Sequence, residues 1–178
     1  MAIFIPKRFA STGLRAVREI TAEEITAYNT QGFVFLRGLF QKQECDILLK
    51  TVEKDKLLTQ QTMKMTDGSG KISKVSLWNN AGNDTYGMFA RGHRMVNAVT
   101  QLIGAEPYHF HTKIMLKEPK VGGAWEWHQD FGYWYQVGCL DPNAMLSAIV
   151  AIDQHTLQNG CLEVTYAIRS PCCLFPIP

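Results

Sequence analysis

The chain has 178 residues, of which 46% are hydrophobic and 19% charged, with a formal net charge of +2. This length predicts one domain with a core of its own, and the composition is typical of a globular protein. The near-neutral charge gives no reason to expect a nucleic-acid partner, and no apolar run reaches the roughly 18–20 residues that span a bilayer. The five cysteines form no C-x-x-C pair, which favours reduced thiols and a cytoplasmic protein.

Residues 1–20 are basic, with four lysines and arginines and no acid before Glu19. This composition faintly resembles a transit peptide, which makes a mitochondrial location the alternative. We favour an extended N-terminal arm that lies on the domain, because Pro6 disfavours an amphipathic helix there.

Helix signals dominate the first half of the chain. Thr21 and Glu24 have the spacing of a capping box, and Gly32 stands where a helix C-cap requires a left-handed residue. Apolar stripes at helical spacing follow, and Gly104 stops the last of them. The expected helices cover residues 22–30, 43–57 and 88–103.

Strand signals are concentrated in the second half. The run from 144 to 152 is continuously apolar, which predicts a strand buried on both faces. Asp67 to Gly70 and Asn159-Gly160 are turn signals. The expected strands cover residues 33–40, 75–78, 108–116, 125–130, 144–152 and 161–164. Helices followed by strands predict an α+β fold.

The most informative stretch runs from Trp125 to Trp134, where His128 and Asp130 are embedded in aromatic residues. In a strand, residues i and i+2 point to the same face, so the imidazole and the carboxylate would meet at one point. They would form two-thirds of the 2-His-1-carboxylate site that holds non-haem Fe(II). The simpler alternatives are a chance pattern or a buried His–Asp hydrogen bond.

Other residues allow both a chemical and a structural interpretation. Lys113 and Lys117 flank an apolar segment and could pair with a substrate carboxylate, although from the residues alone a solvated strand face is the preferred interpretation. His109 and His111 share a strand face and could ligate a metal, although such histidines are commonly packed or solvated. By default, the nearby aromatic residues belong to the core. They are Trp125, Trp127, Tyr133 and Trp134.

Three runs of sequence together resemble the phytanoyl-CoA dioxygenase family, which includes the ectoine hydroxylases. They are residues 110–119, residues 122–134 with His128-Gln129-Asp130, and Asn159-Gly160-Cys161-Leu162-Glu163-Val164. Residues 28–40 also resemble the family's opening, a helix that leads into a first strand. The resemblance covers about residues 21–164 in the same order, and its specific part is the aromatic-flanked His-Gln-Asp.

The resemblance implies a double-stranded β-helix, the jelly-roll or cupin-like fold, with N-terminal supporting helices. It implies an Fe(II)- and 2-oxoglutarate-dependent dioxygenase that uses O₂ to hydroxylate a small organic molecule. His128 and Asp130 match two iron ligands. Lys117 matches a lysine that contacts 2-oxoglutarate, with Lys113 and Gln129 as further candidates. Trp134 matches a substrate-lining tryptophan, whereas Ile149 replaces a tryptophan that several relatives carry near the co-substrate.

The end of the chain departs from this pattern. The family continues with a Gly-Ser-His segment, whose histidine is the third iron ligand, and then an arginine for the co-substrate. No histidine follows His155 here, and Arg169 is the one arginine after it. We therefore expect a dioxygenase domain over 21–164 that is C-terminally incomplete and lacks the last barrel strands. Residues 165–178 would be an unrelated tail, and this truncated form would be inactive.

Two other functions are compatible with the same residues. One is a non-catalytic cupin-like module that keeps a pocket and binds or regulates without iron. The other is a different metal chemistry, in which His109, His111 and His128 form a cupin-type cluster. The sequence does not identify the substrate or the oligomeric state.

Overall fold

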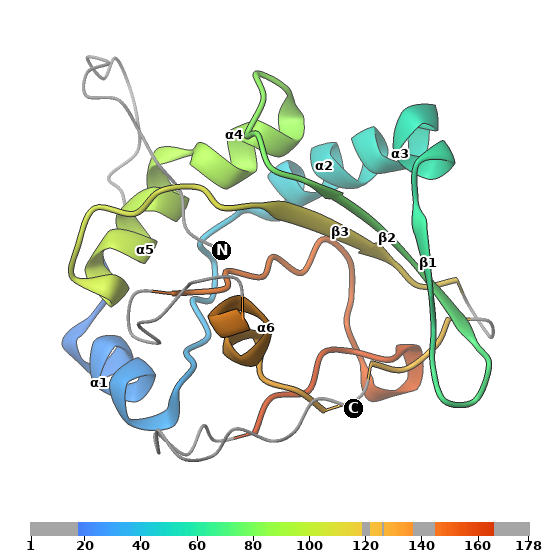
Figure 1. The fold of residues 1–178 in the computed structure, drawn as a ribbon. Coiled ribbons are helices and arrows are strands. Elements are labelled where there is room, and N and C mark those ends of the chain that lie inside the picture. Colours follow the sequence, from blue (N-terminus) through green and yellow to red (C-terminus); the bar gives the residue numbers. More distant parts are fainter. Residues whose placement is uncertain (1–17, 119–121, 126, 137–144, 166–178) are drawn as a thin grey trace.

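A computed structural model describes residues 18–118, 122–125, 127–136 and 145–165. A three-stranded antiparallel sheet crosses the molecule, with helices α2, α3 and α4 on one side and helix α6 and extended chain on the other (Figure 1). This mixture of helices and sheet confirms the expected α+β class. Most of the expected N-terminal arm and nearly all of the expected tail lie outside the described residues. No helix within that part is long and apolar enough to cross a membrane.

Helix α1 (Ala22–Gln31) begins and ends where the sequence predicts. The Thr21 hydroxyl accepts the Glu24 amide at 3.2 Å, and the Glu24 carboxylate accepts the Thr21 amide at 3.0 Å. Gly32 closes the helix with a left-handed φ of 83°. The capping box and the glycine together satisfy backbone groups that a helix end leaves unpaired.

Each of the two longer predicted helices is broken into two. Asp55 separates α2 (Lys42–Lys54) from α3 (Lys56–Gln60), because its extended backbone lets its carboxylate accept the Leu58 amide at 3.0 Å. Gly92, also extended, separates α4 (Thr85–Arg91) from α5 (His93–Ile103). Leu48 and Val52 are buried on α2, and a left-handed Gly104 ends α5 as expected.

The sheet has the order β1-β2-β3. Its strands are Met63–Thr66, Ile72–Trp78 and Thr112–Leu116. The expected turn at Asp67 to Gly70 joins β1 to β2, and Val75 pairs with Met63 on one side and Met115 on the other. Even-numbered side chains of β3 face the helices, where Ile114 packs with Val52 and Leu58. Odd-numbered side chains of β3 therefore face α6.

A second apolar cluster lies on α5. Met95 and Val99 pack there with Leu146, and Ala148 and Val150 lie against the same cluster. Along 145–152 the exposure alternates, so that Leu146 is buried whereas Ile149 is 64% exposed. The segment therefore buries one face, not the two faces that its continuous apolar character predicts.

Four predicted strands are wrong within the described residues. No strand forms over 33–40, 125–130, 145–152 or 161–164. Gly38 turns the first segment with a φ of 71°, and Asp130 begins α6. The exposure of the segment 145–152 alternates as in a strand, but among the described residues no strand pairs with it. A strand also needs backbone hydrogen bonds to a neighbouring strand. The double-stranded β-helix is consequently not confirmed.

The cluster on α5 gives a test of the fold. Val99 is 1% exposed, so Val99→Ala leaves a cavity and should lower the free energy of unfolding by about 2 kcal/mol. Val96→Ala, at a half-buried position of the same helix, should cost clearly less. Urea denaturation of both variants measures the difference, and equal losses would contradict this packing.

Candidate functional site

His128 and Asp130 converge on the side of the sheet that faces α6. His128 lies in irregular chain just before α6 (Asp130–Gln136), and Asp130 is the first residue of that helix. The His128 Nε2 atom lies 3.4 Å from the Asp130 Oδ1 atom, with the two side chains 30% and 35% exposed. Strand alternation predicts this convergence, but the start of a helix produces it.

Ser147 orients the Asp130 carboxylate. Its hydroxyl donates a hydrogen bond to Asp130 Oδ2 at 2.9 Å, which leaves Oδ1 directed toward His128. Hydrogen bonds of this kind fix the carboxylates that bind metals. Ser147 is not among the residues predicted from the sequence. The signal that could have indicated it is that Ser147 has the single hydroxyl in the apolar run 144–152.

Trp125 connects His128 with the sheet. Its ring lies 6.1 Å from the His128 ring, and the Lys113 ammonium lies 5.7 Å from the Trp125 ring centroid. Its indole Nε1 is buried and has no hydrogen-bond partner among the described residues. Trp125 therefore forms one wall of the site, and Lys113 brings a positive charge close to it.

The remaining predicted site residues occupy separate positions. The Lys117 ammonium donates to the Gly160 carbonyl at 3.0 Å, which ties the end of β3 to the turn after Leu157–Asn159. Gln129 is exposed next to the His–Asp pair. Trp134, on α6, lies 4.9 Å from the His111 ring, and Phe110 meets it edge-on at 5.0 Å.

The hypothesis of a three-histidine cluster is wrong. Both ring nitrogens of His109 are engaged, by the Asn79 carbonyl at 3.1 Å and the Thr112 hydroxyl at 2.8 Å. His111 packs against Trp134. Among the described residues, no three His, Cys, Asp or Glu side chains gather closely enough to hold a metal ion.

The environment of His111 affects its protonation. Burial lowers the pKa of this imidazole, the nearby Lys113 ammonium lowers it further, and the Asp130 carboxylate opposes the shift. A lowered pKa keeps His111 neutral at pH 7. The neutral ring avoids the cost of desolvating a charge where His111 packs against Trp134.

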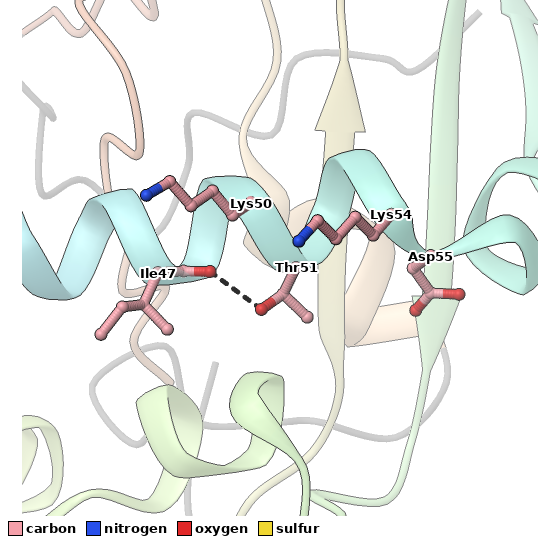
Figure 2. A pocket seen from close by; sticks show the side chains of 5 residues that line it. All are labelled: Ile47, Lys50, Thr51, Lys54 and Asp55. Atoms are coloured by element: carbon pink, nitrogen blue, oxygen red, sulfur yellow. Dashed lines mark hydrogen bonds between the residues drawn. The ribbon is translucent and has the colours of Figure 1, made fainter.

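An open depression lies away from this site, along the C-terminal half of α2. Figure 2 shows Lys50 and Lys54 side by side on the helix, with the Thr51 hydroxyl bonded to the Ile47 carbonyl. Asp55 completes the lining. Helix α2 covers the opposite side of the sheet from α6 (Figure 1), so this depression is separate from His128.

The His128–Asp130 pair fits two positions around a metal ion. Two ligand atoms that each lie about 2.1 Å from a metal ion are about 3.0 Å apart when the ligand–metal–ligand angle is a right angle. The observed distance of 3.4 Å corresponds to an angle of roughly 110°. Imidazole nitrogen and carboxylate oxygen are both ligands of non-haem Fe(II). The described residues supply no third ligand to this pair.

Comparison with known proteins identifies the class. Residues 28–165 match the model of the family described as phytanoyl-CoA dioxygenase (PhyH). Ectoine dioxygenase from Bordetella parapertussis is 25% identical over 144 residues, which is 79% of this chain and 47% of that protein. Phytanoyl-CoA dioxygenase 1 from Oryza sativa is 24% identical over 155 residues, 84% of this chain and 54% of that protein.

A shorter match is L-proline trans-4-hydroxylase from Streptomyces griseoviridis, 33% identical over 70 residues, which is 39% of this chain and 26% of that protein. No solved structure matches. By name these relatives are two dioxygenases and a hydroxylase. The chain belongs to the phytanoyl-CoA dioxygenase family. It spans about half the length of the curated relatives that it matches over most of its own length.

The pKa of His111 tests the arrangement of charges around α6. In metal-free protein, Lys113→Gln should raise this pKa because a positive charge is lost, and Asp130→Asn should lower it further because a negative charge is lost. Lys117→Gln should leave it unchanged. NMR titration of the imidazole, assigned with a His111→Gln variant, measures all three. Equal values in all variants would contradict the proximity of these groups.

Proposed function

We propose that this chain carries part of the active site of an Fe(II)- and 2-oxoglutarate-dependent dioxygenase that hydroxylates a small organic molecule. The observation that supports this most directly is the 3.4 Å approach of His128 Nε2 to Asp130 Oδ1, within residues that match the phytanoyl-CoA dioxygenase family. Bound iron would carry out the chemistry with O₂, which no side chain can perform.

The protein's own residues would hold and enclose the metal. His128 and Asp130 would bind it as two ligands, and Ser147 would keep the carboxylate turned toward it. Phe110 and Trp134 pack beside His111 on the same side of the sheet, where they would exclude water. The described residues do not supply the third ligand, so we expect this chain alone to bind iron weakly and to be inactive.

Three polar residues are the proposed contacts of 2-oxoglutarate, which carries two carboxylates. Lys113 is an exposed cation on the face of the sheet toward α6, where it would attract one carboxylate. Lys117 uses one of its three donors on the Gly160 carbonyl and would offer another. Gln129 is exposed next to both iron ligands.

The substrate would lie against an apolar surface. Trp134 is the proposed substrate contact, and exposed side chains on the same face of the sheet continue this surface. Among these, Met65 and Met115 are 44% and 38% exposed, and the register places both on the face that carries Lys113. Unbranched methionine side chains adapt to ligands of different shapes. The chemistry of this surface supports an organic substrate with an apolar part.

Metal titration tests the ligand assignment. His128→Ala and Asp130→Ala should each weaken anaerobic binding of Fe(II) or Co(II) at least tenfold, because each variant removes one of two ligands. His155→Ala is the matched control, since His155 forms a similar pair with Asp153, at 3.1 Å and with exposures of 40% and 65%. Succinate release from 2-oxoglutarate reports the activity. Equal losses in all three variants would exclude His128 and Asp130 as specific ligands.

Ser147 provides a more selective test. Ser147→Ala removes one hydrogen bond from the Asp130 carboxylate without changing a proposed ligand, and should weaken Co(II) binding by roughly tenfold. Ser147→Thr retains the hydroxyl and should recover most of the affinity. If alanine and threonine behave alike, the hydroxyl does not orient Asp130.

A further inference from the structure

The turn between β1 and β2 contacts the chain that leads to His128. Asp67 Oδ1 accepts hydrogen bonds within the turn, from the Ser69 amide and hydroxyl at 2.9 and 2.8 Å and from the Lys71 amide at 2.9 Å. Its other oxygen, Oδ2, accepts the amide of Ala124 at 2.8 Å, across 57 residues of sequence. One carboxylate therefore stabilises the turn and binds a distant segment at the same time.

A second contact lies next to the first. The Ser73 hydroxyl donates to the Gly123 carbonyl at 3.0 Å, and Ser73 is only 1% exposed. A Cβ atom on Gly123 would stand 2.7 Å from the Lys71 carbonyl oxygen, closer than real Cβ contacts. The absence of a side chain at Gly123 thus lets the two backbones meet, and two side-chain hydrogen bonds hold them together.

These contacts fix one end of the segment that carries His128. Ala124 precedes His128 by four residues, and Trp125, the next residue, packs against the His128 ring. The far end of the segment is fixed at Asp130 by Ser147. His128 therefore stands between two anchors, one on the β1–β2 turn and one at the start of α6.

The carboxylate of Asp67 is suited to this role over a wide pH range. The Ala124 amide, followed by the hydrogen bonds from the turn, lowers its pKa to about 2. Because the folded pKa is depressed, the stabilising contribution is complete above the ordinary value of 3.8 and is lost as the pH falls through about 2. The contact is therefore ionic in character at any pH at which an enzyme would work.

We propose that Asp67 and Ser73 are positioning residues of the candidate metal site, which fix the backbone at Gly123 and Ala124 and thereby the distance between His128 and Asp130. The expected effect of these residues on metal binding rests on the proposed function. The contacts themselves do not depend on it.

Two substitutions and two controls test the proposal in the whole chain. Asp67→Asn leaves one acceptor oxygen, so the side chain can no longer accept both the donors of the turn and the Ala124 amide. Ser73→Ala removes the bond to Gly123. Each should weaken Co(II) binding about tenfold and speed hydrogen exchange of the Ala124 amide. Ser69→Ala removes a bond within the turn alone and should change Co(II) affinity less than twofold.

Val99→Ala separates positioning from overall stability, since it should lower the melting temperature without weakening Co(II) binding. Three results would overturn the proposal. They are unchanged affinity in Asp67→Asn and Ser73→Ala, an equal loss in Val99→Ala, or unchanged exchange at Ala124. If the unmodified chain binds no Co(II), the proposed function fails. Faster exchange at Ala124 in Asp67→Asn and Ser73→Ala would then still support the anchoring of this segment.

Discussion

Two backbones approach each other directly where the β1–β2 turn meets Gly123, and the side of the sheet that faces α6 depends on this contact. A side chain at position 123 would push the segment away from the Lys71 carbonyl. The bonds from Asp67 and Ser73 would then lose their geometry, since hydrogen bonds weaken steeply with distance and angle. The ring of Trp125 and the imidazole of His128 would shift with the backbone that carries them.

The two sides of the sheet are held by different forces. On the helix side, Val52, Leu58 and Ile114 form a buried apolar cluster, the main source of stability in a domain. On the side toward α6, polar contacts join chain segments, and methionines of the sheet remain exposed. The proposed ligands thus lie on the side where apolar side chains such as Met65 and Met115 remain exposed, and where a bound substrate would add contacts.

Local signals predicted the parts of this structure that local forces determine. The capping box at Thr21, the turn at Asp67 and the stop at Gly104 form within a few residues, and each is confirmed. The strands expected over 33–40 and 144–152 do not form within the described residues, because a strand needs a partner that its own sequence does not specify. The family resemblance selected His128 and Asp130. Contacts across tens of residues, such as Asp67 to Ala124, leave no periodic pattern to read.

The alternation along β3 has a consequence for sequence change in this family. His111, Lys113, Met115 and Lys117 alternate with residues such as Ile114 that fill the helix-side cluster. Insertion or deletion of one residue in β3 would exchange the two sets, placing a lysine in the apolar cluster and an isoleucine next to Trp125. A change of two residues would return each set of side chains to its original face of the sheet. Length variation in β3 should therefore be tolerated among relatives in steps of two, whereas variation in the turn after β1 changes which residue can reach Ala124.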